Sequence, residues 1–239
     1  MAKKDHPREF FTSRRRFLVV PPALFLAGCE FASRGKTGSV LKGFQKFNDW
    51  VQAKVFDPEK PAPEYADEAI TPEDGFRVNG YDTDEPDMDI PNWTLEVDGL
   101  VKAPGEYSMK QISTLPKHVK NLRHVCVEGW SMIPKWGGVL MKDFLALAGA
   151  DMTAKYVSVE CGDDYFTSWD MPSVLHPQTL LAYEAYGRPL ELEHGAPLRV
   201  VMPVKLGYKS AKWITRLTVT NEKPGGYWED QGYDWFAGI

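Results

Sequence analysis

Apolar side chains recur along the chain in short runs, and most of these runs have the spacing of β-strands. Trp93, Leu95 and Val97 alternate with polar residues, and an Asp-Gly pair then supplies a turn. Five more stretches are apolar or alternating over five to eight residues: 122–127, 156–160, 180–186, 198–202 and 213–220. In the last of these, every second residue from Trp213 to Val219 is expected on one face.

Helical spacing is confined to a few segments. Ser108 and Gln111 form a capping box that predicts a short helix ending near residue 115. Residues 139–148 are amphipathic and Gly149 supplies a stop, while residues 42–54 carry apolar side chains at near-helical spacing. Many short strands with few helices predict an α+β fold that is mainly β.

Residues 1–29 have the pattern of an export signal and are set aside from the fold. Residues 13–18, Ser-Arg-Arg-Arg-Phe-Leu, match the twin-arginine pattern and precede a short apolar stretch. That stretch ends in Leu-Ala-Gly-Cys, which resembles the lipobox of bacterial lipoproteins, so Cys29 is expected to carry a lipid anchor. The alternatives are a basic disordered N-terminus and signal cleavage without lipidation. The signal predicts a periplasmic, membrane-anchored protein. Twin-arginine systems export proteins in the folded state, often with a cofactor already bound.

The remaining chain divides by composition into a lead-in and one domain. Residues 30–70 are expected to form a tether, because residues 57–64 are Pro-rich, charged and therefore extended and unpacked. The compact domain is expected over residues 71–239.

Charge and cysteine content narrow the functional classes. The net charge is −5, and it becomes −9 once the six basic and two acidic side chains of residues 1–28 are removed. This balance argues against nucleic acid as a partner. No apolar run reaches the roughly 18 to 20 residues of a spanning helix. Three cysteines cannot form a complete set of disulfides, so each needs its own explanation.

The densest group of reactive side chains is His124, Cys126 and Glu128, which are spaced by two. In a strand they would share one face, and a thiol beside an imidazole and a carboxylate suggests a metal or redox centre. A buried cysteine in a strand is more often a small apolar residue, so the spacing alone leaves both interpretations open.

Three sequence blocks add to this pattern: Cys-Val-Glu-Gly-Trp-Ser-Met at 126–132, Gly-Ala-Pro-Leu-Arg-Val-Val-Met-Pro at 195–203, and Lys-Leu-Gly-Tyr-Lys-Ser-Ala-Lys-Trp-Ile at 205–214. Their order and spacing resemble the sulfite-oxidase superfamily, and are most similar to its periplasmic methionine sulfoxide reductase catalytic subunits. The resemblance implies a single sulfite-oxidase-type molybdopterin-binding domain with molybdenum-molybdopterin (Mo-MPT) as cofactor. It makes Cys126 the thiolate ligand of the metal, a soft ligand that suits a sulfur-bound metal.

A terminal phosphate on the cofactor requires local positive charge in an acidic protein. Four cations lie within fourteen residues, with Ser210 and Ala211 between them: Arg199, Lys205, Lys209 and Lys212. Arginine suits a bidentate phosphate contact and lysine acts as a point charge. The alternative is a solvated edge whose lysines point outward.

Three further positions are expected near the cofactor through the resemblance. His194 stands where the relatives have an asparagine, and its charge would then vary with pH. Cys161 stands where they have a threonine, with an inert core cysteine as the alternative. Asn79 falls in the segment that corresponds to the N-terminal pterin-binding segment.

The resemblance implies oxygen-atom transfer at molybdenum, with reduction of a sulfoxide such as oxidised methionine as the expected reaction. Glu128 and His124 are expected to act through water or proton transfer. The alternatives are sulfite oxidation, for which Arg123 can serve, a metal-free lipoprotein scaffold, and a zinc site from His124, Cys126 and Cys161.

The sequence also bears on partners. It contains no Cys-x-x-Cys-His motif for covalent haem, so a separate electron-transfer partner is expected, by analogy a membrane haem protein. About twenty residues follow Val219, fewer than the dimerisation domain of sulfite oxidases needs, so a monomer is expected.

Overall fold

In the computed structural model, residues 36–80 and 85–239 are described. The export signal, Cys29 and the first residues of the tether lie outside this part of the chain. The chain divides into two compact units, Met1–Asn48 and Asp49–Ile239. Among the described residues, no helix combines the length and the apolar character needed to cross a bilayer.

One long helix precedes the domain. Helix α3 (Lys36–Val55) confirms and lengthens the helix expected at 42–54. Its last residues belong to the second unit, where Gln52 donates to the carboxylate of Asp234 at 2.6 Å and accepts from the backbone N–H of Gly238 at 3.0 Å. The C-terminal segment is thus packed against this part of the helix.

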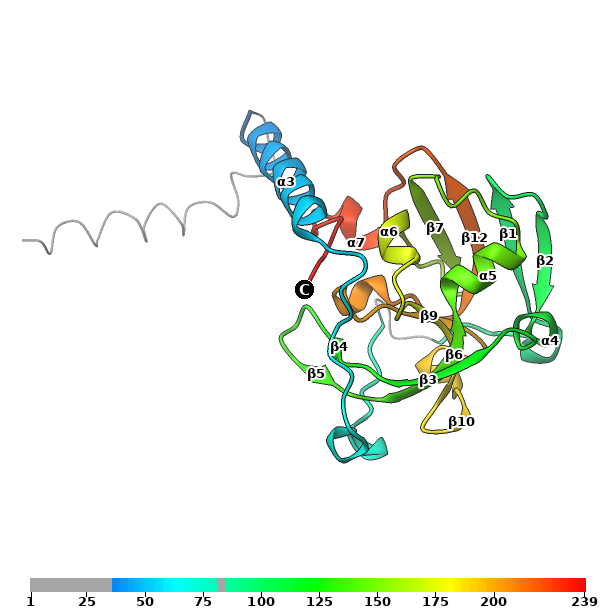
Figure 1. Ribbon diagram of the computed structural model, residues 1–239. Coiled ribbons are helices and arrows are strands. Elements are labelled where there is room, and N and C mark those ends of the chain that lie inside the picture. Colours follow the sequence, from blue (N-terminus) through cyan, green and yellow to red (C-terminus); the bar gives the residue numbers. More distant parts are fainter. Residues whose placement is uncertain (1–35, 81–84) are drawn as a thin grey trace, which may run out of the picture. The chain divides into compact units, whose positions relative to one another are not determined.

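The second unit is built on two five-stranded sheets. Figure 1 labels most of their strands. The first has the order β2-β1-β12-β7-β8 and comprises β1 (Thr94–Gly99), β2 (Gly105–Ser108), β7 (Tyr156–Cys161), β8 (Phe166–Asp170) and β12 (Ile214–Thr220). Its β1 and β12 are parallel, and its other neighbours are antiparallel. The second has the order β10-β9-β6-β3 with β11 paired to β9, and comprises β3 (Lys117–Asn121), β6 (Lys135–Leu140), β9 (Leu180–Ala185), β10 (Arg188–Pro189) and β11 (Arg199–Val201).

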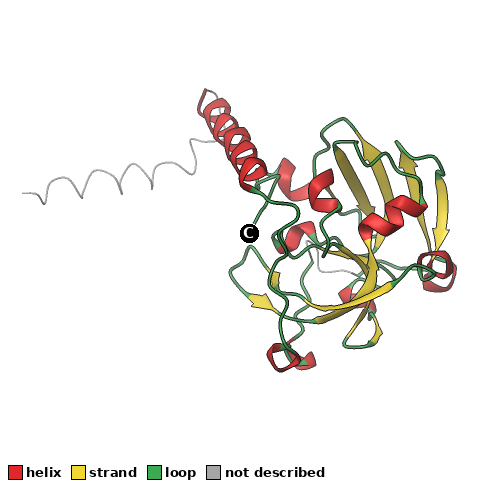
Figure 2. Cartoon of the chain, in the orientation of Figure 1, coloured by secondary structure: helices red, strands yellow, loops and turns green. Residues whose placement is uncertain are grey.

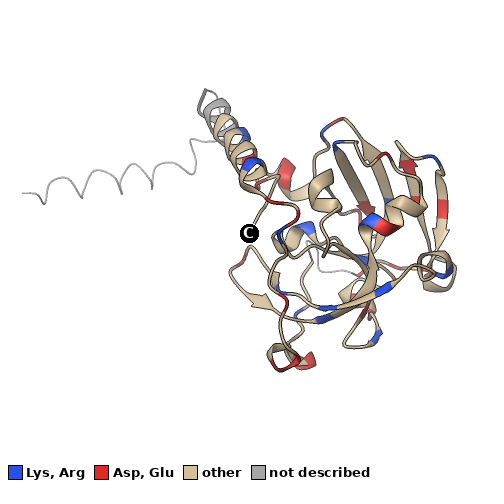
Figure 3. Ribbon diagram, viewed as in Figure 1, with Lys and Arg blue, Asp and Glu red and all other residues tan. Residues whose placement is uncertain are grey.

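Short helices and one small hairpin complete the unit, and strands predominate as predicted (Figure 2). The helices are α4 (Met109–Ile112), α5 (Met141–Leu147), α6 (Met171–Val174) and α7 (Tyr227–Asp230). The capping box at the start of α4 is confirmed. The hairpin pairs β4 (His124–Val125) with β5 (Ser131–Met132). Acidic and basic residues are interspersed along the described chain (Figure 3).

The core consists of two apolar clusters. In the larger one, alternate residues of β1, β7 and β12 pack with α5, as Leu95, Val157 and Phe144 illustrate. The smaller one surrounds the fully buried Trp136 on β6. Burial of these apolar side chains is the main stabilising contribution to the fold.

Two predicted elements were wrong in part. Residues 122–127 do not form one strand, because β3 ends at Asn121 and β4 stops at Val125. Residues 139–148 are not a single helix, because Val139 and Leu140 extend β6 and pair with β9. A short apolar run fits a buried strand as well as a helix, and here the neighbouring strand decided between them.

Two packing expectations also changed. A bulge between Ile214 and Arg216 shifts the phase of β12, so Ile214 is buried together with Leu217 and Val219. Residues 57–64 are neither extended throughout nor unpacked. The Lys60 N–H closes a turn onto the Asp57 carbonyl at 3.2 Å, and the Gln178 amide exchanges hydrogen bonds of 2.8 and 2.9 Å with the backbone of Ala62. The second unit accordingly includes much of the expected tether.

Candidate active site

Six chain segments line one cleft, and four of them carry the chemistry that the sequence predicts. These are residues 77–80, the β4–β5 hairpin, the stretch from Glu193 to Arg199, and the loop at 207–212. The other two are the turn at 163–165 and the C-terminal segment, which supplies Trp228 and Tyr233. The cleft therefore depends on long-range contacts rather than on one local motif.

Cys126 lies at the start of the hairpin turn rather than within a strand. Its N–H donates to the carbonyl of Trp130 at 2.9 Å, and the N–H of Gly129 donates back to the Cys126 carbonyl at 3.1 Å. Gly129 has a φ of 90°, which glycine adopts at little cost. The expected alternation of His124, Cys126 and Glu128 on one strand face is therefore wrong, yet the turn brings all three to the cleft.

Cys126 is 7% exposed, and its thiol faces Asn79. The Asn79 Nδ2 donates to its Sγ at 3.6 Å and to Glu128 Oε2 at 3.4 Å. Burial raises the pKa of the Cys126 thiol, because desolvation disfavours the thiolate. A cation or a metal in the cleft would have the opposite effect.

Glu128 is held by two donors that converge on one oxygen. Trp130 Nε1 donates to Glu128 Oε2 at 2.9 Å, beside the contact from Asn79. The guanidinium of Arg77 lies over the Trp130 ring, 5.2 Å from its centroid. Glu128 thus links the Asn79 segment to the turn that carries Cys126.

Arg199 is a buried residue of the cleft wall. Its Nη1 donates to the carbonyl of His194 at 2.7 Å and its Nη2 to the carbonyl of Ser210 at 3.3 Å. Its guanidinium also lies 4.8 Å from the Trp136 ring centroid. Burial lowers the pKa of Arg199 to about 10, so it remains charged at neutral pH. Its Nε has no hydrogen-bond partner among the described residues.

Ser210, Ala211 and Lys212 form the cleft wall that begins beside Arg199. Lys212 Nζ donates to the carbonyl of Glu193 at 3.0 Å. Burial, followed by repulsion from Arg199, lowers the pKa of Lys212 to about 8. Two cations and the backbone around Ser210 are therefore available to an anionic group.

His194 lies at the cleft with its ring stacked on Phe76, at a centroid distance of 3.7 Å. Burial, followed by repulsion from Arg199, lowers the pKa of His194 to about 4. The imidazole is therefore neutral around pH 7. The expected change of its charge with pH falls well below neutrality.

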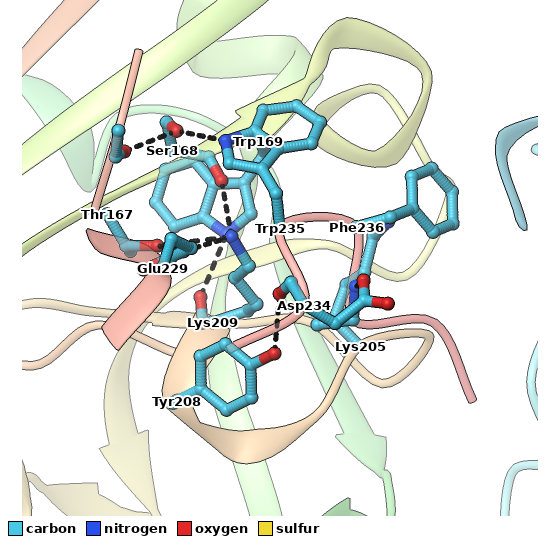
Figure 4. Close-up of polar contacts among 12 residues, drawn as sticks. Thr167, Ser168, Trp169, Lys205, Tyr208, Lys209, Glu229, Asp234, Trp235 and Phe236 are labelled. Atoms are coloured by element: carbon cyan, nitrogen blue, oxygen red, sulfur yellow. Dashed lines mark hydrogen bonds and ion pairs between the residues drawn. The ribbon is translucent and has the colours of Figure 1, made fainter. Parts of the chain in front are cut away.

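Lys205 and Lys209 are not in the wall of this cleft, contrary to the expectation that they join Arg199 and Lys212. Lys205 Nζ lies 3.3 Å from Asp170 Oδ1, and Lys209 Nζ is paired with Glu229 (Figure 4). Each ammonium is almost fully buried, so each requires a carboxylate partner. The four cations that are close in sequence are thus divided between two sites.

Cys161 is also outside this cleft. It is 6% exposed, lies at the end of β7 in the larger core cluster, and burial raises its thiol pKa well above the ordinary value. Among the described residues, the one group of three ligand atoms within 4.8 Å is Glu191, Glu193 and His194. A zinc site from His124, Cys126 and Cys161 is therefore wrong.

Several cleft residues were not anticipated from the sequence: Arg77, Tyr165, Tyr208, Trp228 and Tyr233. Arg77 could have been inferred from its nearness to Asn79. The two C-terminal aromatics carry no such signal, because only the folded chain returns residues 228–233 to the cleft. Arg123, considered for oxyanion binding, lines a different groove and donates to Ser131 Oγ at 3.0 Å.

Comparisons with known proteins identify the family of this chain. The family model described as oxidoreductase molybdopterin binding domain matches residues 82–228. A putative protein-methionine-sulfoxide reductase subunit YedZ1 of Azospira oryzae is 44% identical over 230 residues, which cover 95% of this chain and 88% of the relative. The protein-methionine-sulfoxide reductase catalytic subunit MsrP of Ralstonia nicotianae is 27% identical, over 95% of this chain and 74% of the relative.

A solved structure supports the fold alone. The sulfane dehydrogenase SoxCD from Paracoccus pantotrophus superposes with a TM-score of 0.53 at 23% identity. The match covers 57% of this chain and 40% of that one, so this chain corresponds to about two fifths of the solved chain.

Proposed function

Because this chain belongs to the family of oxidoreductases with a molybdopterin-binding domain, we propose that it reduces a sulfoxide, with methionine sulfoxide in proteins as the substrate class. The reaction consumes two electrons and two protons and yields a thioether and water. The observation that carries the proposal is the Cys126 thiol, which faces Asn79 across a cleft that also holds Arg199 and Lys212.

The residues present fit a molybdenum-molybdopterin cofactor. Cys126 offers a soft sulfur ligand at the cleft, and metal binding would offset the burial that raises its pKa. The unpartnered Nε of the buried Arg199 and the ammonium of Lys212 suit a phosphate. Ser210, Ala211, Asn79 and His194 would contact the remainder of the group. When bound, the cofactor would supply the oxygen-atom transfer and its two-electron redox change.

The side chains around Cys126 would orient the site and handle protons. Asn79 would hold the Cys126 sulfur in place through its Nδ2. Glu128 accepts from both Asn79 and Trp130 at Oε2, which fits a carboxylate. It would take up a proton at Oε1, the oxygen that neither donor contacts, and pass it to the oxygen of the sulfoxide. Neutral His194 would donate a hydrogen bond without adding charge.

Export and anchoring complete the proposal. The twin-arginine pattern would place the loaded protein in the periplasm, and lipidation of Cys29 would hold it at the membrane. Electrons would come from a separate partner, for which a membrane haem protein is the expected class. The relative from Ralstonia is named a catalytic subunit, which supports a division of labour between two proteins.

Sulfite oxidation is the second candidate function. The observation that favours it is the Arg77 guanidinium at the cleft, where it can attract an oxyanion. Arg123 does not add to this charge, because it lines the other groove.

The test uses protein purified from its own periplasmic or membrane fraction. Near-stoichiometric molybdenum, together with oxidation of reduced viologen by peptide methionine sulfoxide, is the expected result. Cys126→Ser should lose the molybdenum or alter its paramagnetic signal. Loaded protein that oxidises sulfite and leaves sulfoxides untouched would establish the second candidate instead.

A further inference from the structure

The C-terminal segment contributes to the cleft and packs against the loop at 205–212. Tyr208 Oη donates to the carbonyl of Asp234 at 2.6 Å, and the N–H of Leu206 donates to the carbonyl of Ala237 at 2.9 Å. In Figure 4 the indole of Trp235 lies beside the Lys209 side chain. The Lys209 Nζ is 5.2 Å from the centroid of the Trp235 ring. The segment therefore supports the loop that leads into Ser210.

Two adjacent residues of α7 have different environments. The Trp228 side chain lines the cleft that contains Cys126. The Glu229 side chain is only 4% exposed and forms an ion pair with Lys209 (Figure 4). One short helix thus joins a cleft-lining ring to a buried charge pair.

The buried pair is fixed by several hydrogen bonds. Lys209 Nζ also donates to the carbonyl of Ser168 at 3.0 Å and lies 3.4 Å from Thr167 Oγ1. Thr167 Oγ1 donates to Glu229 Oε1 at 2.6 Å. A Cβ added to Gly226 would collide with the Glu229 carboxylate, so the turn before α7 also fits closely around it. These contacts leave Glu229, and therefore the neighbouring Trp228, little freedom.

Trp228 is part of a continuous aromatic surface in the cleft. Its ring lies 5.0 Å from that of Tyr233, which lies 5.7 Å from the ring of Tyr208. All three residues line the cleft, with Trp130 on the hairpin. Aromatic faces and edges bind thioether groups and apolar side chains favourably, and they offer a larger contact to a peptide than to a two-carbon sulfoxide.

We propose that Trp228 is a specificity-determining residue that contacts the peptide-bound side of a sulfoxide substrate, and that Glu229, through Lys209, is the residue that positions it. This inference rests on the proposed function, since it assigns the substrate side of the same site. It places recognition on the C-terminal segment, whereas the cofactor would be held by the other segments of the cleft.

The test compares two substrates in the molybdenum-loaded protein, with reduced viologen as electron donor. Trp228→Leu should raise KM for a methionine sulfoxide peptide about tenfold, because it removes sulfur–aromatic and ring contacts. For dimethyl sulfoxide KM should change less than about twofold, since a small ligand touches little of this surface. Trp228→Phe should restore most of the affinity for the peptide. Molybdenum content should stay at the wild-type level throughout.

Glu229→Gln tests the positioning role, and Asp230→Asn on the same helix is the matched control. Glu229→Gln should raise KM for the peptide about threefold and increase amide hydrogen exchange over residues 224–239, because it removes the charge opposite Lys209. Lys209 is paired with Glu229 and not with Asp230, so the control variant should leave both readouts unchanged. An equal effect of the two substitutions would overturn the positioning role.

A binding measurement that needs no turnover separates the two proposals. Isothermal titration calorimetry with a methionine sulfone peptide should give a Kd for Trp228→Leu about tenfold above that of the wild type. Unchanged KM and unchanged sulfone binding in Trp228→Leu, with an active wild type, would overturn this inference alone. A loaded wild type that reduces no sulfoxide would instead contradict the proposed function.

Discussion

The Nζ of Lys209 forms a buried ion pair with the carboxylate of Glu229, twenty residues further along the chain. Both side chains are almost fully buried, at 1% and 4% exposure. Lys209 immediately precedes Ser210, and Glu229 immediately follows Trp228. The pair therefore connects the loop proposed to hold the cofactor with the segment proposed to recognise the substrate.

Removing one member of this pair should be strongly destabilising. Lys209→Met leaves the Glu229 carboxylate buried without its partner, which should lower the free energy of unfolding by roughly 3–5 kcal/mol. Adding Glu229→Leu should recover much of that loss, because two apolar side chains leave no unpaired charge. Urea unfolding monitored by circular dichroism gives both values.

The exposed pair Lys117–Glu184 serves as the control, since the Lys117 side chain is 43% exposed. Lys117→Met should cost less than about 1 kcal/mol, as is usual for surface ion pairs. Equal losses at the two pairs would show that burial does not govern the contribution of Lys209.

Two substitutions at Glu128 should separate its charge from its hydrogen bonds. Both donors meet one oxygen, so the amide oxygen of Glu128→Gln can accept from Asn79 and Trp130 as before. Molybdenum content and thermal stability should be retained in this variant, while turnover should fall about a hundredfold if the carboxylate transfers a proton. Wild-type turnover in Glu128→Gln would limit Glu128 to orienting its two donors.

Glu128→Ala should have a different effect, because it releases Asn79 and Trp130 together. We expect a loss of molybdenum content as well as of turnover. Elemental analysis of both variants, purified side by side, distinguishes the two roles.

His194 should make the protein less stable in acid. Its pKa is about 4 in the fold and about 6.5 in an unfolded chain. Arg199 and Lys212 disfavour the charged imidazole, whereas Glu191 and Glu193 favour it, and burial outweighs them. Between these pKa values the unfolded chain binds more protons, so the free energy of unfolding falls as pH falls from 6.5 toward 4.

His194→Asn should flatten this pH dependence, with a difference of at most about 3 kcal/mol at the acid end and none above pH 7. Urea unfolding of wild type and variant at several pH values between 4.5 and 7.5 measures the difference. Parallel curves for the two proteins would contradict the lowered pKa.

Gly207 should tolerate no side chain. A Cβ at this position would lie 2.6 Å from His124 Nε2 and 3.2 Å from the Val125 carbonyl, immediately before Cys126. Gly207→Ala should therefore displace β4, cost about 1–3 kcal/mol of stability and lower the molybdenum content. Gly43→Ala on α3 is the control, because nothing lies within 4 Å of an added Cβ there. Retention of molybdenum and stability in Gly207→Ala would show that the hairpin can move.

Local patterns in the sequence determined most of the secondary structure and the family. Alternation from Trp93 to Val97, the capping box at Ser108 and the turn glycine after 180–186 each depend on neighbouring residues, and the corresponding elements are present. The block that begins at Cys126 likewise indicates the family from consecutive residues alone. The family model that matches residues 82–228 confirms it.

Tertiary structure alone decided which side chains meet. In the sequence, Lys205 and Lys209 lie close to Arg199 and Lys212. In the fold, the first two side chains are buried, and each pairs with a carboxylate, Asp170 of β8 or Glu229 of α7. Trp228 reaches the cleft only because the C-terminal segment folds back. Burial depends on the whole chain, so no local pattern can specify where a charge finds its partner or how far its pKa shifts.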